Sequence, residues 1–213
     1  QLELEVDGAL AIARVTPAGE DSPRYTAMKM GDVAVRMNAI ASDTSSFNLD
    51  GTITVKQLDI NKTTKKDPAC NTETCERYQR LDWDYTGTGE YLNPGAYLPT
   101  PTNLTIDFTS DMHYRVAGGV KGAAADADAG IVQDQLLSAG GVTLTGQAEF
   151  ALSRWQRDIQ TPEGTLFGAT LDSVALQVNN VGVQVADPQL ELEVDGALAI
   201  ARVTPAGEDS PRY

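Results

Sequence analysis

Apolar and polar residues alternate with a period of two along most of this chain. The first run is LELEV at residues 2–6, and after Asp7-Gly8 the alternation resumes as ALAIA at residues 9–13. Successive side chains of a β-strand point to opposite faces, so this period predicts strands. The Asp-Gly step between the two runs predicts either a hairpin turn or a bulge within one long strand.

The first 25 residues occur twice without a change. QLELEVDGALAIARVTPAGEDSPRY occupies residues 1–25 and again residues 189–213. A folded domain normally offers one place in its sheet that fits a given series of side chains, so we expect one copy to be surplus to a single domain and to pair with a neighbour by strand addition. Pairing is expected to bury the apolar residues of this assembly strand: Leu2, Leu4, Val6, Leu10, Ile12, Leu190, Leu192, Val194, Leu198 and Ile200.

Three explanations of the duplication stay open at this point. The chain is one 188-residue period, followed by the start of the next, from a tandem array of near-identical domains. Alternatively, it is a fibre subunit whose terminal strand complements the next subunit, and the second copy caps the groove or stands for the neighbour's strand. The third explanation is a duplication without biological meaning.

Residues 26–188 are predicted to form a single antiparallel β-sandwich or jelly-roll-like domain of eight to eleven strands, with little helix, completed by the donor strand. We expect long loop excursions at about 61–102 and 117–130, because both stretches are rich in turn residues. Residues 103–116 are predicted to form a strand pair or one bent strand. A single helical turn is expected at 131–137.

The first excursion contains a group of aromatic residues next to carboxylates. Aromatic rings offer apolar faces and carboxylates accept hydrogen bonds from hydroxyls, so this group predicts a glycan contact. Two other roles stay open, namely covering the sheet under a long loop or contacting another subunit. The candidate glycan residues are Trp83, Tyr85, Tyr91 and Tyr97.

Cys70 and Cys75 enclose four residues, and a local disulfide is the natural interpretation. Loop closure would give it about 2 kcal/mol, which pins a loop without holding the fold together. Two free thiols in a cytosolic protein are the alternative. Zinc is disfavoured, because His113 is the only histidine and there is no second cysteine pair.

Asp126 and Asp128 alternate before Gly130 in the way that carboxylate ligands alternate in a calcium loop. Three further ligands are missing from the local sequence. We therefore expect either a calcium site at these two residues or no cofactor at all.

The charge of the chain narrows the list of partners. Its 16 Lys and Arg stand against 30 Asp and Glu, which gives a net charge of −14. Nucleic acid and anionic membranes are poor partners for such a surface. No apolar run approaches the ~20 residues that a membrane-spanning helix needs.

Catalytic motifs are absent from the sequence. His113 lies in an alternating strand pattern, and there is no nucleophile elbow, phosphate-binding loop or zinc-protease motif. A chain that starts at Gln1 is typical of a processed or excerpted protein, and secretion is expected. We expect no enzyme, but a structural subunit or repeat unit of an extracellular or cell-surface filament, pilus or adhesin stalk, whose partner is itself. The alternative is a carbohydrate-binding surface module that uses residues 78–97. No known family is recognised.

Overall fold

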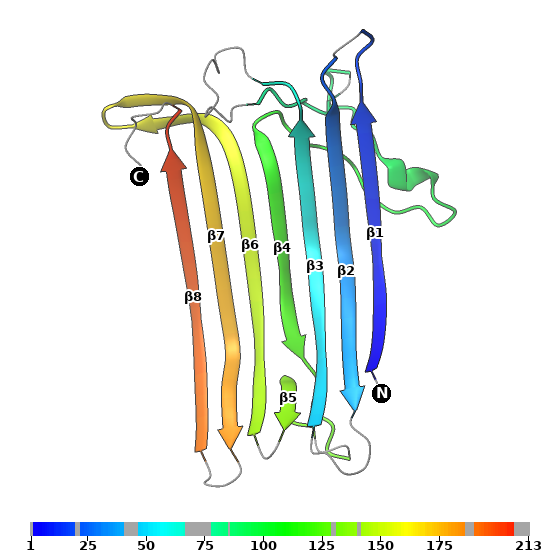
Figure 1. Cartoon of the computed structure of the whole chain (residues 1–213), viewed down its shortest axis with the longest axis vertical. Helices are drawn as coiled ribbons and strands as arrows, with labels where there is room; N and C mark the ends of the chain where they lie inside the picture. The colour runs from blue at the N-terminus through cyan, green and yellow to red at the C-terminus, as the bar shows by residue number, and fades with distance from the viewer. Residues whose placement is uncertain are drawn as a thin grey trace.

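The computed structural model describes residues 2–19, 22–40, 47–66, 78–84, 86–128, 131–139, 142–185 and 190–206, without the side chains of 2–6, 37–40, 47–50, 190 and 191. Eight strands join in one antiparallel sheet (Figure 1), and the helical structure of the described residues is the short 3-10 turn η1 (Pro94–Tyr97). The strands are β1 (Leu2–Val15), β2 (Tyr25–Ile40), β3 (Phe47–Thr63), β4 (Met112–Gly122), β5 (Gln135–Ala139), β6 (Val142–Thr161), β7 (Gly164–Val185) and β8 (Leu190–Thr204).

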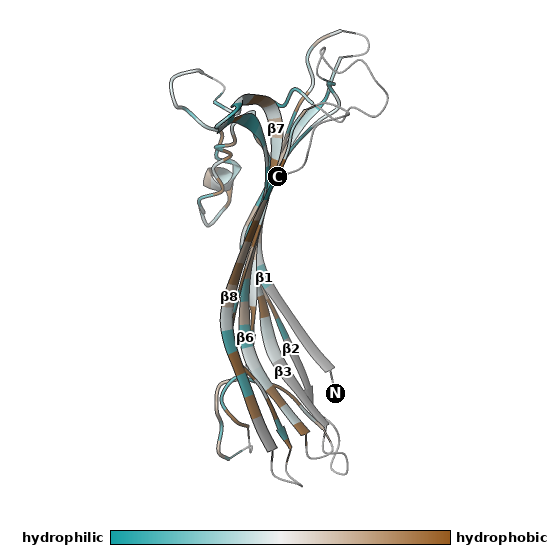
Figure 2. Ribbon diagram, turned by 90° about the vertical axis from the view of Figure 1, so that its left-hand side faces the viewer, coloured by the Kyte–Doolittle hydropathy of each residue, from teal (hydrophilic) through white to brown (hydrophobic). Residues whose placement is uncertain are grey.

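The sheet follows chain order. Its path is β1-β2-β3-β4-β6-β7-β8, and the short β5 pairs with both β3 and β6 beyond the end of β4 (Figure 1). The predicted all-β, antiparallel class is confirmed, and eight strands lie within the predicted range. The described strands stay in a single sheet, because each one pairs with the strand that precedes it on this path and none crosses over to another sheet. Seen from the side, they form one twisted layer at mid-height (Figure 2).

The strands are long because the Asp-Gly steps do not turn the chain. β1 runs through Asp7-Gly8 with a register shift between Asp7 and Ala9, so the bulge alternative is confirmed. β3 likewise continues through Asp50-Gly51. β7 reaches 22 residues, whereas strands of 3–10 residues are usual.

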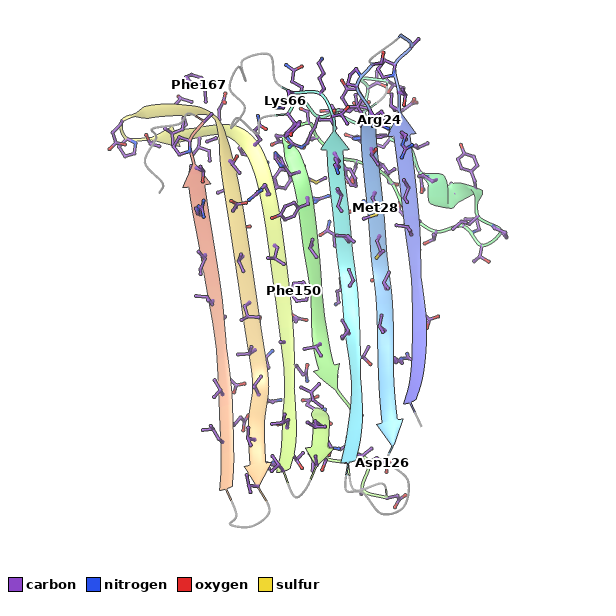
Figure 3. The ribbon with its side chains drawn as sticks, viewed as in Figure 1. Arg24, Met28, Lys66, Asp126, Phe150 and Phe167 are labelled. Carbon is purple, nitrogen blue, oxygen red and sulfur yellow. The ribbon has the colours of Figure 1, made fainter. Side chains whose placement is uncertain are left out.

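One face of the sheet is apolar over much of its extent, although Arg154, Asp172 and Arg202 also lie on it. Residues directly opposite each other on neighbouring strands share a face. One such row crosses all seven strands of the path with apolar residues, namely Leu10, Met30, Leu58, Val116, Leu152, Val174 and Ile200. Leu10 is 50% exposed and Ile200 is 55% exposed. We call this side the apolar face; Met28 of β2 and Phe150 of β6 lie on it (Figure 3).

The opposite side, which we call the mixed face, carries small, polar and charged residues. Its row next to the one above reads Ala11, Lys29, Asp59, Arg115, Ser153, Ser173 and Ala201. Asp59 is fully buried in this row and pairs with Arg115 at 2.8 Å. No helix among the described residues is long and apolar enough to cross a membrane.

An irregular segment packs on the mixed face at one end of β1 and β2. This covering segment, residues 78–84 and 86–111, runs between β3 and β4 (Figure 1). The core lies under it and consists of Ala13, Ala27, Trp83, Ile106, Phe108 and Met112. What packs on the sheet here is therefore an irregular segment and not a second sheet. The alternation of apolar residues that is typical of strands nevertheless continues into this segment.

Residues 103–111 belong to the covering segment. The strand structure predicted for 103–116 begins only at Met112. Leu104, Ile106 and Phe108 are at most 3% exposed, yet Ile106 makes one isolated bridge, to Leu92. Their alternation arises because an extended segment lies with one side on the sheet. The strand prediction for 103–111 is wrong for this reason.

Two further local predictions are wrong. The glycine-rich residues 117–122 are part of β4 and not of a loop, and residues 131–137 form a turn followed by β5 in place of a helical turn. The glycines allow neighbouring strands to approach closely, because a Cβ at Gly118 of β4 would lie 2.4 Å from the carbonyl oxygen of Thr54 in β3. Glycine that permits tight strand packing looks, in sequence, like glycine in a flexible loop.

Candidate functional site: the two edges of the sheet

The duplicated segment stands at both edges of the same sheet. β1 pairs with β2 and β8 pairs with β7, and the two copies point in the same direction (Figure 1). In that view β2 lies on the left of β1, whereas β7 lies on the right of β8. The two copies therefore use opposite edges of one and the same strand. Within the described sheet, each copy leaves open the edge that the other copy uses.

The prediction that one chain offers a single place for this segment is wrong. Both copies are paired in the same sheet. The side-chain pattern specifies which face of a strand is apolar, but a strand has two hydrogen-bonding edges, and each can find a different partner. The role of the segment in assembly stays a prediction.

The close packing of β1 against β2 depends on Gly8. Its φ is +156°, and a Cβ there would lie 2.4 Å from Val33 Cγ2 and 2.8 Å from Val33 Cα. Any other residue would collide with β2 at the bulge. The packing further along this strand is also close, since Ala11 is 3% and Ala13 is 8% exposed on the mixed face, where the covering segment packs.

The edge of the segment that meets β7 is fixed by a carboxylate. The backbone N–H of Asn180 donates to Asp195 Oδ1 at 2.6 Å, at the position where β7 bulges and Asn180 has a φ of +52°. The side chain of Asn180 is in turn tied down, because its Nδ2 donates to Asp134 Oδ2 at 3.3 Å.

Asp134 anchors this bulge from inside the protein. It is 1% exposed, and its carboxylate also accepts hydrogen bonds from Gln147 at 2.8 Å and Gln133 at 2.9 Å. Burial disfavours the ionised form, but the hydrogen bonds from Gln147, Gln133 and Asn180, together with the charge of Lys121, outweigh it and hold the pKa of Asp134 below its usual value. β7 thus presents a prearranged N–H to the aspartate of the segment.

The two copies differ in what surrounds them. The Cβ position of Gly196 has no heavy atom within 4 Å, in contrast to that of Gly8. Ala199 and Ala201 are exposed, although the matching Ala11 and Ala13 are buried. Ala199 borders an open groove of about 730 Å³ on the mixed face. Within the described chain, β8 therefore lacks the cover that β1 has, and it has no strand on the edge that corresponds to the β2-facing edge of β1.

The predicted assembly residues lie on the apolar face where their side chains are described. Leu10, Ile12, Leu192, Val194, Leu198 and Ile200 are 50–59% exposed. Pairing with β2 or β7 in the same sheet covers backbone edges and leaves these faces open. The expectation that pairing with a neighbouring chain buries these residues stays a prediction. Leu2, Leu4, Val6 and Leu190 lie in β1 and β8, opposite Ala39, Met37, Val35 and Val185.

One of the predicted glycan residues, Trp83, does not lie on the surface. Trp83 is 4% exposed, and its Nε1 donates to Asn61 Oδ1 at 3.1 Å in the interior. It covers the sheet, which was one of the alternatives for these aromatic residues, and its ring cannot stack on a sugar. Tyr85 lies outside the described residues. Tyr91 and Tyr97 are 39% and 84% exposed.

The remaining candidate sites gain no further support. Asp126 lies in a loop at the end of the sheet opposite Arg24 and Lys66 (Figure 3), where its Oδ1 accepts the N–H of Asp128 at 3.0 Å. The described part of the chain holds no group of three or more potential metal ligands. The calcium site stays a prediction. Cys70 and Cys75 lie outside the described residues.

His113 takes part in a contact under the covering segment that sequence reasoning missed. Its Nδ1 lies 2.9 Å from Arg80 Nη2. Burial, followed by the charge of Arg80, lowers the pKa of His113 to about 4, and burial lowers the pKa of Arg80 to about 10. At neutral pH the uncharged imidazole accepts a hydrogen bond from the guanidinium, a structural role.

Comparison of the chain with family models, with curated proteins and with solved structures gave no match.

Proposed function

We propose that this protein is a structural unit that assembles with copies of itself into an extracellular or cell-surface filament, such as a pilus or an adhesin stalk. The segment of residues 1–25 joins consecutive units. One observation carries the proposal: an identical strand stands at both edges of one sheet, in the same direction, with opposite edges open.

The geometry supports continuation of the sheet. In the proposed filament the segment is an inner strand, with β7 of one unit on one side and β2 of the next unit on the other. The sheet then repeats every six strands, namely β1 to β4, β6 and β7. Because six is even, each unit keeps the same strand direction and the antiparallel alternation is unbroken. Both rows of open backbone donors and acceptors would then be paired.

The apolar face also supports an assembling protein. Monomeric proteins rarely expose large contiguous apolar surfaces, and such surfaces mark interaction sites. Val174, Leu176, Leu198 and Ile200 are 40–55% exposed side by side on β7 and β8. Like-charged units of net charge −14 repel each other at long range, so assembly should strengthen as salt screens the charge.

Electron microscopy and intact mass of the native material test this proposal. We expect filaments, and their behaviour on boiling with reductant tells how units are joined. A mass many times 22.7 kDa after this treatment means a covalent tandem array, whereas a single unit means strand pairing between chains. Native material that contains neither filaments nor repeats of the unit overturns the proposal.

A carbohydrate-binding surface module is the second candidate function. Exposed Tyr97 and half-exposed Tyr91 on the covering segment favour it. Glycan binding that is lost in Tyr91→Ala and Tyr97→Ala would support this function. Absence of binding to every glycan on an array would exclude it.

A further inference from the structure

Because the two copies of the segment are identical, each can pair with the strand edge that the other copy occupies. We propose that the copies act as caps: β8 occupies on β7 the place of a second molecule's β1, and β1 occupies on β2 the place of a second molecule's β8. In the chain with both copies, the edges of β2 and β7 at which another molecule could add its strand are therefore both occupied. This inference rests on the proposed function and specifies its partner as a second copy of the same chain.

The edge of β2 is a built acceptor for β8 of a second molecule. Residues 190–204 match residues 2–16 one for one. When β8 enters this site, Gly196 takes the place of Gly8 against Val33, where only glycine fits. Ala199 and Ala201 then take the buried places of Ala11 and Ala13 under Trp83 and Phe108.

The edge of β7 is a built acceptor for β1 of a second molecule. Asn180 is held by the buried carboxylate of Asp134 and offers its N–H to Asp195. Asp7 is the residue that matches Asp195 in the first copy. It can accept the same hydrogen bond, because β1 leaves open the edge with which β8 binds β7.

Exchange between two intact chains yields no new pairing. If β8 of one molecule replaces β1 of another, each new interaction is the same as the one that it replaces, since the two sequences are identical. Association nevertheless costs translational and rotational freedom. The chain with both copies is therefore expected to remain monomeric, and release of either copy opens one edge and permits head-to-tail growth.

Proline substitutions in the full chain release one copy at a time. Alternate residues of a strand direct their N–H groups to opposite edges, so one proline is needed at an even and one at an odd position. The variant L10P/A13P releases β1, and its exact counterpart L198P/A201P releases β8. The variant with all four prolines has two open edges and no intact segment with which to fill them.

Sedimentation and light scattering then give the masses. We expect the parent at 22.7 kDa and both double variants at several times this mass. The fourfold variant should not grow, but should bind a synthetic peptide of residues 1–25. The same peptide should return each double variant to the single-unit mass, and a scrambled peptide should not. This peptide arm also identifies misfolded aggregates, which it cannot dissolve and whose appearance would count against the inference.

The outcomes separate the inference from the function on which it rests. If the parent assembles as far as the double variants, the copies are not caps, although the segment still joins units. If neither double variant grows and no variant binds the peptide, an open edge does not recruit the segment, and both the inference and the proposed function are wrong.

Discussion

β1 and β8 have the same sequence and differ in nearly everything that surrounds them. Ala11 and Ala13 are buried under the covering segment, whereas Ala199 and Ala201 are exposed. Gly8 is pressed against Val33, whereas Gly196 faces open space. Burial is thus set by the neighbours of a strand and not by the strand itself. The pair is an internal control, in which any difference in the effect of matched substitutions measures environment alone.

The largest difference in stability between the surroundings of β1 and those of β8 should come from the covering segment. Phe108→Ala removes a ring that is 1% exposed over β1 and β2, and we expect it to lower the free energy of unfolding by about 3–5 kcal/mol. Phe167, near the start of β7 (Figure 3), is 69% exposed. Phe167→Ala is the matched control and should stay within about 0.5 kcal/mol. Urea unfolding compares the two; equal losses would mean that the covering segment contributes no core.

The glycines of the two copies give the next largest contrast. Gly8→Ala places a Cβ inside the contact distance of the Val33 backbone at a φ of +156°, and we expect a loss of about 1–3 kcal/mol. Gly196→Ala meets no atom within 4 Å and should change stability by less than about 0.5 kcal/mol. Thermal unfolding of both variants checks this. A similar cost at both sites would contradict the different environments of the two copies.

Replacing the aspartates of the two copies should give a smaller difference in stability, and here the substitution in β8 should cost more than the one in β1. Asp195→Ala removes the hydrogen bond to Asn180, and we expect a loss of about 1 kcal/mol, confined to β8, because the site is exposed to water. Asp7→Ala is its control and should have the weaker effect in the monomer. Hydrogen exchange of β8 amides is the measurement. Unchanged exchange in Asp195→Ala would remove this aspartate from the β7 edge.

A pH dependence of stability is also expected, and it reports on the covered end alone. An unfolded chain protonates His113 near its ordinary pKa of 6.5, whereas the folded chain does so only near 4. Between these values the unfolded state binds more protons, so stability falls as pH drops from 6.5 toward 4. His113→Gln should flatten this part of the stability profile. A profile with the same slope in the variant would assign the acid sensitivity to other groups.

Much of the fold was accessible from the pattern of residues. Alternation predicted the strand character of both copies, and the scarcity of helix is confirmed among the described residues. The Asp7-Gly8 step left a bulge and a hairpin open, because both place glycine after aspartate. Only the register with β2 distinguishes them.

The errors share one cause, since each concerns a residue whose role depends on a distant neighbour. Gly118 looked like part of a loop because the carbonyl of Thr54, which requires glycine there, is remote in sequence. Trp83 was a candidate for glycan binding because its partner, Asn61, is twenty-two residues away. No local signal marks either contact.

The sequence by itself determined that both copies of the segment contain a strand with one apolar face, seen as β1 and β8, because side-chain period sets the face of a strand. It could not determine which edge each copy presents to its neighbour. Every residue other than proline carries the same backbone donor and acceptor, so the edges of a strand look alike in sequence. Only the tertiary structure decided that β1 lies against β2 and β8 against β7, because Val33 and Asn180 become neighbours of the segment only in the folded sheet.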